Sequence, residues 1–112
     1  MSKTIDSSLK SFISSYVNSL ASWAIIVFYH QNPGVRDRVS DLAMHLGRRE
    51  NDIEKAVEHL TESGLLKKEE GDNGAIYIYE PDLRLREQVN AFVDALDVRE
   101  LRLWVLSEVL GG

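Results

Sequence analysis

The pattern that most constrains the fold is a pair of short amphipathic segments joined at Gly47. Ser40 is predicted to cap the first helix, over 41–46, because its hydroxyl can accept a hydrogen bond from an early helical amide. A second helix, over 49–63, is predicted to end next to Gly64, a residue favoured at helix C-termini. Its apolar face recurs at three- and four-residue spacing and consists of Ile53, Ala56, Val57 and Leu60. Two helices joined by so tight a turn predict a helix-turn-helix.

A β-hairpin is predicted directly after this pair of helices. One strand covers 65–70, a turn with glycine at both ends covers 71–74, and β-branched and aromatic residues alternate over 75–79. Pro81 closes the second strand because proline cannot donate to a strand ladder.

Helical periodicity also precedes the helix-turn-helix. A helix over 7–21 is predicted from a stripe that would bury one face, formed by Leu9, Phe12, Ile13, Tyr16, Val17 and Leu20. Residues 23–30 continue the helical pattern but are apolar nearly all round, so they are expected to be central to the core. The sequence leaves open whether the chain bends near residues 19–22.

Two further helices are predicted after the hairpin, over 82–96 and 98–110. Asp97 and Glu100 fit the N-cap and third positions of a capping box at the start of the last helix.

Composition narrows the class of protein. With 112 residues the chain is expected to form one domain, over 1–112. It has no cysteine, which excludes disulfides, thiolate metal sites and cysteine nucleophiles. No apolar run approaches the roughly 18 residues that suggest a membrane span, and MSKTIDSSLK lacks the apolar segment of a secretory signal. We therefore expect a cytoplasmic protein that does not bind membranes.

The stretch VSDLAMHLGRRENDIEKAVEHLTESGLLKKEEGDNGAIYIYE resembles the core of MarR- and ArsR-type winged-helix transcriptional regulators. The likeness lies in the LA..LG turn, the apolar spacing of the second helix, the SGLL exit and the IYIY strand, and it extends over residues 22–80. It implies a mainly α fold with a small β-hairpin (α+β). It also implies that the flanking segments, 7–21 and 82–110, are dimerisation helices.

What this resemblance implies about function is regulation of transcription by a homodimer on double-stranded DNA. In such families the second helix of the motif, here about 49–63, enters the major groove. The hairpin, here 65–80 and called the wing, lies along the DNA backbone.

A helical wheel divides the polar side of the 49–63 helix into two stripes. One stripe is basic or neutral and contains Arg48, Asn51, Lys55 and His59; the other is acidic and contains Glu50, Glu54, Glu58 and Glu62. The first stripe has donors suited to adenine, guanine and phosphate. The predicted DNA contacts are Arg48, Arg49, Asn51, Lys55 and His59 on the helix, with Arg36, Arg38, Lys67 and Lys68 on phosphate.

Several acidic residues support an alternative. The net charge is −5, Glu54 stands where ArsR-type helices often have a small hydroxyl residue, and the predicted wing tip contains Glu69, Glu70 and Asp72. Carboxylates near phosphate repel it, so tight sequence-independent DNA binding is not expected. The alternative is a winged-helix adaptor that binds protein through its acidic flank and does not bind DNA. The basic residues would then belong to a solvated surface.

The last helix is apolar around most of its circumference, more than a small monomer usually exposes. Its outward residues are predicted to form a homodimer interface together with the 9–20 helix: Leu103, Trp104, Leu106, Val109 and Leu110. The other interpretation is that both sides of this helix are buried within one chain.

Catalytic and metal-binding patterns are absent from the sequence. It contains no nucleophile elbow, P-loop or zinc-protease motif, so no enzymatic activity and no catalytic residue are expected. Asp41 and His45 are four residues apart, but two ligands do not complete a metal site. No cofactor is predicted. A small-molecule effector is left open, because Phe12, Tyr16 and Trp23 are equally well explained as core aromatics.

Overall fold

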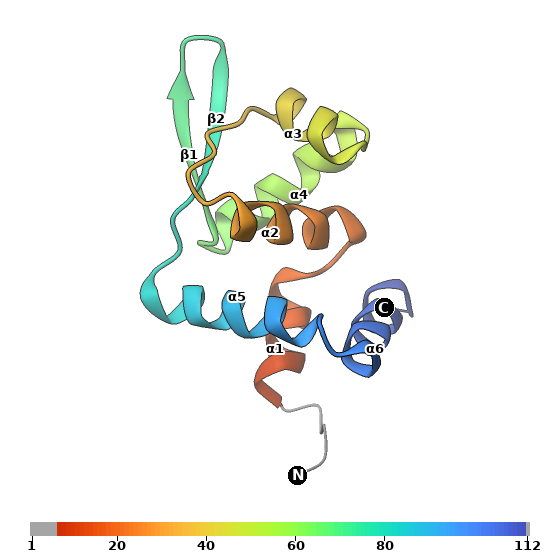
Figure 1. The fold of residues 1–112 in the computed structure, drawn as a ribbon. Coiled ribbons are helices and arrows are strands. Elements are labelled where there is room, and N and C mark those ends of the chain that lie inside the picture. Colours follow the sequence, from red (N-terminus) through yellow and green to blue (C-terminus); the bar gives the residue numbers. More distant parts are fainter. Residues whose placement is uncertain (1–6, 112) are drawn as a thin grey trace.

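The computed structural model describes residues 7–111 as six helices and one two-stranded antiparallel sheet (Figure 1). The elements are α1 (Ser7–Tyr16), α2 (Leu20–Gln31), α3 (Val39–Leu46), α4 (Glu50–Glu62), β1 (Leu66–Gly71), β2 (Gly74–Tyr79), α5 (Leu83–Ala95) and α6 (Arg99–Gly111). The expected class, mainly α with a small β-hairpin, is confirmed. Residues 1–6 and 112 lie outside the described part, and with them most of the stretch used to judge a secretory signal.

α2 is the central helix of the described fold. It packs against α4 on one side and α5 on the other, while α1 packs on α5 and α6 (Figure 1). Its inward residues Ile25, Ile26 and Tyr29 are fully buried, as the apolar pattern predicted. Its opposite face is only half covered, because Trp23 and Val27 remain partly accessible.

The predicted helix over 7–21 is wrong in its extent. α1 ends at Tyr16, and α2 begins at Leu20 after a bend of 108°. Ser19 causes the new start, because its hydroxyl accepts a hydrogen bond from the amide of Ser22 at 3.0 Å. The bend lets α1 pack its apolar stripe on α5 while α2 runs through the core.

The predicted cap of α3 is also wrong. The helix begins at Val39, so Arg38 and not Ser40 is the N-cap residue. The side chain of Asp41 accepts from the backbone amide of Arg38 at 3.0 Å, which satisfies a donor at the helix start. This hydrogen bond, followed by the one from the Arg38 side chain, lowers the pKa of Asp41. Gly47 ends the helix in a left-handed conformation, with φ 65°.

The hairpin follows α4 after the left-handed Gly64. β1 begins at Leu66, one residue later than predicted, and its register pairs Leu66 with Tyr79 and Gly71 with Gly74. Gly74 has φ 111°, which a side chain would strain, so the tight turn through 72–73 depends on this glycine.

The start of α6 differs from prediction as well. The backbone amides of residues 96, 97 and 98 each donate a hydrogen bond to the carbonyl three residues earlier, so the turn continues from the end of α5. The amide of Asp97 is therefore already bonded, to the carbonyl of Asp94. α6 therefore begins at Arg99, and the carbonyl of Val98 accepts its first helical bond. Val98, not Asp97, occupies the capping position. α5, in contrast, is capped by Asp82, whose side chain accepts from the amide of Leu85.

The base of the hairpin is tied to the segment before α3. Asp37 and Tyr77 exchange two backbone hydrogen bonds, of 3.3 and 2.8 Å. The hydroxyl of Tyr29, from α2, donates to the same Tyr77 carbonyl at 2.8 Å. These bonds hold the hairpin in place relative to α2 and α3.

Tyr29→Phe tests this attachment. Burial, reinforced by the nearby Asp37 carboxylate, raises the pKa of Tyr29 above its ordinary value. The unfolded chain therefore ionises this phenol first, and Tyr29 stabilises the fold below about pH 10 and loses that contribution as the pH rises further. We expect the variant to lose about 0.5–1.5 kcal/mol near neutral pH, because one hydrogen bond is removed.

Urea titrations of both proteins, at neutral pH and again above about pH 10, measure this effect. The wild type should lose more stability between the two conditions than Tyr29→Phe. Some alkaline loss should persist in the variant, because burial also raises the pKa of Tyr79. Equal losses in the two proteins would show that Tyr29 does not ionise on unfolding.

No single helix within residues 7–111 has the length and apolar character to cross a membrane. α1 and α2 meet those criteria only as a pair, bent by 108° at the break between them.

Candidate nucleic-acid interface

The polar side of α4 divides into two flanks that face different neighbours. Glu50, Glu54 and Glu58 face the hairpin, whereas Asp52 and Lys55 face the break between α1 and α2. Glu50, Glu54 and Glu58 of the predicted acidic stripe thus lie apart from Arg48 and Lys55 of the predicted basic stripe, and Asn51 is exposed. The direction each stripe faces follows from the apolar residues of α4, which are buried against α2 and α3.

The acidic flank lines a concavity of about 370 Å³, which we call the hairpin groove. Its walls come from the start of α3, the acidic flank of α4 and the hairpin: Arg38, Val39, Ser40, Glu50, Glu54, Glu58, Lys68, Asn73, Ala75 and Tyr77. Three carboxylates thus face two cations, and Arg38 is already paired with Asp41 at 3.3 Å. The hairpin groove consequently has an excess of negative charge.

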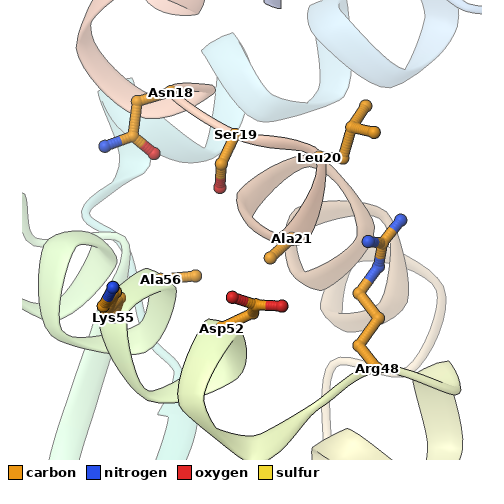
Figure 2. Close-up of a pocket in the computed structure, with 8 residues that line it drawn as sticks. All are labelled: Asn18, Ser19, Leu20, Ala21, Arg48, Asp52, Lys55 and Ala56. Atoms are coloured by element: carbon orange, nitrogen blue, oxygen red, sulfur yellow. The ribbon is translucent and has the colours of Figure 1, made fainter.

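The other flank lines a pocket of about 420 Å³ between α4 and the start of α2, which we call the α4 pocket. Figure 2 shows Asp52 directed into it from α4, with Arg48 and Lys55 on either side. Ser19 and Ala21 form the opposite wall. Because Ser19 caps α2, the positive end of that helix also lies at this pocket. The α4 pocket is therefore the more favourable of the two concavities for an anion.

Most of the Lys and Arg residues predicted to contact DNA have acidic partners. Four of these seven are paired within residues 7–111: Arg36 with Glu69, Arg38 with Asp41 at 3.3 Å, Arg49 with Asp52 at 3.6 Å, and Lys67 with Glu80 at 3.6 Å. These side chains are largely exposed, so each pair contributes little to stability and can exchange its partner. Arg48, Lys55 and Lys68 have no ion-pair partner in this part of the chain.

Asn51 and His59 were predicted on the same stripe, and the structure separates them. Asn51 is exposed. His59 is half-buried, and its Nε2 atom is enclosed without a hydrogen-bond partner among the described residues. The surface shared by Asn51 and Lys55 therefore does not include that imidazole nitrogen.

The structure also reveals a cluster that the sequence did not indicate. Asp37 is buried and lies 2.9 Å from Nδ1 of His45, whose ring stacks on Phe28. Asp41, four residues before His45, is hydrogen-bonded to Arg38. Residues 7–111 contain no group of three side chains suited to a metal ion. The cluster connects α2, α3 and the segment before it, and no sequence spacing marks it.

The apolar residues predicted for dimerisation fall into two groups. Leu103, Leu106 and Leu110 are exposed on α6, whereas Trp104 and Val109 pack partly against the core. In the 9–20 stretch, expected to contribute to the same interface, Phe12, Ile13 and Val17 are buried within the chain, whereas Leu9, Tyr16 and Leu20 are half-buried. The homodimer interface stays a prediction.

Comparison with known proteins leaves the family open, since the chain matches no family model and no curated protein.

Proposed function

We propose that the chain is a winged-helix, cytoplasmic transcriptional regulator of the MarR- or ArsR-like kind that binds double-stranded DNA. The observation that carries the proposal is the placement of α4. It follows α3 after a short turn, its polar face is accessible, and it presents the exposed Asn51 together with Lys55, which has no ion-pair partner among the described residues. In this proposal α4 enters the major groove and the hairpin follows the backbone.

The roles of individual residues follow from their chemistry. Asn51 can donate to and accept from adenine in the major groove, and Lys55 can donate to guanine or phosphate. Arg48, beside the N-terminus of α2, suits a phosphate because the guanidinium and the helix end are both positive. The paired cations contribute only after releasing their carboxylates. We therefore expect weak binding at physiological salt and strong dependence on salt concentration.

A second function is favoured by the hairpin groove. There Glu50, Glu54 and Glu58 face the space that the DNA backbone would approach between α4 and the hairpin. A basic peptide segment would be attracted by the same carboxylates. The competing proposal is therefore an adaptor that binds a basic protein partner through the hairpin groove and does not bind DNA.

Lys55→Glu distinguishes the two functions. For a DNA-binding protein, the loss of one phosphate contact should weaken binding about tenfold at about 0.05 M salt and reduce the salt slope by about one. The measurement is fluorescence anisotropy with a random pool of labelled double-stranded DNA, at several salt concentrations.

Lys10→Glu is the matched control, because Lys10 is equally exposed but lies on α1, at the opposite end of the fold from the hairpin (Figure 1). It changes the net charge identically and should weaken binding much less. Absence of binding by the wild type at low salt, or equal effects of the two variants, would remove the DNA proposal.

A further inference from the structure

One turn on the outward side of α4 carries three side chains of different hydrogen-bonding chemistry: the amide of Asn51, the carboxylate of Glu54 and the ammonium of Lys55. Positions three and four apart are neighbours on a helix surface, so Glu54 and Lys55 both lie beside Asn51. All three are exposed, and within residues 7–111 neither Glu54 nor Lys55 forms an ion pair. They belong to the first half of α4, and the N-terminal residues of a DNA-reading helix are the ones that contact base edges. Glu54 therefore stands among the residues proposed above to meet DNA.

The packing of α4 holds Glu54 in this position. Ile53, directly before it, and Val57, one turn after it, are fully buried, which fixes the rotation of the helix about its axis. The two basic residues that line the hairpin groove do not neutralise the carboxylate. Arg38 is paired with a different carboxylate, and Lys68 forms no ion pair in the described part of the chain. Glu54 is therefore available as a hydrogen-bond acceptor on the exposed surface.

The four bases differ in what they offer a carboxylate in the major groove. An ionised carboxylate only accepts hydrogen bonds. Guanine and thymine present acceptors there, at O6 and N7 and at O4, which oppose a carboxylate. Adenine has an amino group beside the acceptor N7, a pattern suited to an amide such as that of Asn51. Cytosine presents an amino group and no acceptor, so it is the base that the carboxylate of Glu54 fits.

We propose that Glu54 determines the sequence preference of this protein by accepting a hydrogen bond from the amino group of a cytosine, while Asn51 and Lys55 contact bases beside it. This inference rests on the DNA-binding function proposed above. At a cytosine the carboxylate gains a partner, whereas at guanine or thymine it faces acceptors and opposes the complex. A residue that weakens binding to DNA in general thus favours one class of site.

Selection from a random pool of double-stranded DNA at low salt, followed by sequencing, tests this preference. The sites enriched by the wild type should share a cytosine, and replacing that base pair should weaken binding about tenfold or more, as loss of a matched base contact does. Glu54→Gln should move the preference at this one position from cytosine to adenine, because a glutamine amide both donates and accepts. Glu87→Gln is the matched control, since it removes the same charge from an exposed position on α5 and should leave the selected sequence unchanged.

Removal of the amino group alone tests the contact itself. In a duplex with 2-pyrimidinone in place of the shared cytosine, the wild type should lose about tenfold more affinity than Glu54→Ala, although both proteins meet the same altered base pair. Circular dichroism should show that the variant is folded. Equal losses in the two proteins, or the same selected sequence for Glu54→Gln and the wild type, would overturn the inference.

The Lys55→Glu experiment separates this inference from the function on which it rests. If the wild type does not bind the random pool at low salt, the proposed function and this inference are both wrong. If the wild type binds the pool and Glu54→Gln selects the same sites, only this inference is wrong. If it binds and Glu54→Gln exchanges cytosine for adenine, both are supported.

Discussion

Phe92→Ala is expected to lower the free energy of unfolding by about 3–5 kcal/mol, because it removes a fully buried aromatic ring and leaves a cavity. Phe92 lies on α5 where two parts of the core meet. Its ring is 5.2 Å from that of Phe12 on α1 and 6.3 Å from that of Trp23 on α2. These three helices cannot close the space without moving relative to one another. The expected loss is a large fraction of the roughly 5–15 kcal/mol typical of a domain.

Urea unfolding monitored by tryptophan fluorescence measures this loss directly, because Trp23 is one of the contacting rings. Leu83→Ala is the matched control on the same helix. Leu83 is exposed, so its truncation should change the stability by no more than about 0.5 kcal/mol. Both variants should be compared with the wild type at one protein concentration, since association shifts apparent stability. Equal effects of the two substitutions would contradict the central position of Phe92 in the core.

Reversal of charge in the hairpin groove is expected to have the largest effect on DNA binding. Glu54→Lys with Glu58→Lys should raise the affinity for random double-stranded DNA about a hundredfold at about 0.05 M salt. Each new cation beside a phosphate contributes about tenfold under those conditions. Both side chains are exposed on the α4 wall of the groove, so the substitutions should not disturb the core. The salt slope should become steeper by about two.

The control must change the net charge equally at a distant place. Glu87→Lys with Asp94→Lys does so, since both residues are exposed on α5. If this control raises the affinity as much as the groove variant, total charge and not the α4 surface governs binding. If neither variant binds DNA at low salt, the adaptor function gains support. In that case the groove variant should also lose the basic partner while the α5 variant retains it.

Local patterns predicted most of the architecture, because helix and hairpin signals are contained within short stretches. The spacing of Ile53, Val57 and Leu60 placed α4 to within one residue at each end. The glycines at 71 and 74 located the turn correctly. The two polar stripes of α4 followed from the same periodicity. A helical wheel, however, has no reference direction outside the helix, so it did not reveal that the acidic stripe faces the hairpin.

Predictions failed where the outcome depended on a choice between equivalent local partners. Ser40 is a suitable cap, but the side chain of Asp41 accepts from the amide of Arg38, and α3 starts two residues earlier than predicted. The sequence left open whether the chain bends near residues 19–22, and it does so at Ser19, whose hydroxyl accepts a hydrogen bond from the amide of Ser22. The pairing of Asp37 with His45 depends on packing against Phe28, which no sequence spacing encodes.

Packing also determines which of the predicted DNA-binding Lys and Arg residues are paired with acidic side chains. Arg36 lies 33 residues from Glu69, and Lys67 meets Glu80 across the hairpin base. The sequence contains both acids, but only the folded hairpin brings them beside the basic residues. Lys55 has no ion-pair partner among the described residues, and Asp52, which lines the same pocket, pairs with Arg49.

The bonds between Asp37 and Tyr77 have a consequence for association with other chains. A two-stranded sheet has two open edges, and an unpaired edge is a template onto which an extended segment of another chain can add. On the β2 side, the amide and carbonyl of Tyr77 are already bonded to Asp37, and the Tyr29 hydroxyl donates to the same carbonyl. A foreign strand could therefore pair along the base of β2 only after displacing residue 37. The free edge of the sheet is β1, where Lys67, Lys68, Glu69 and Glu70 are consecutive. A row of charged residues on an edge strand opposes addition of another strand, so the hairpin is protected on one edge by its own chain and on the other by charge.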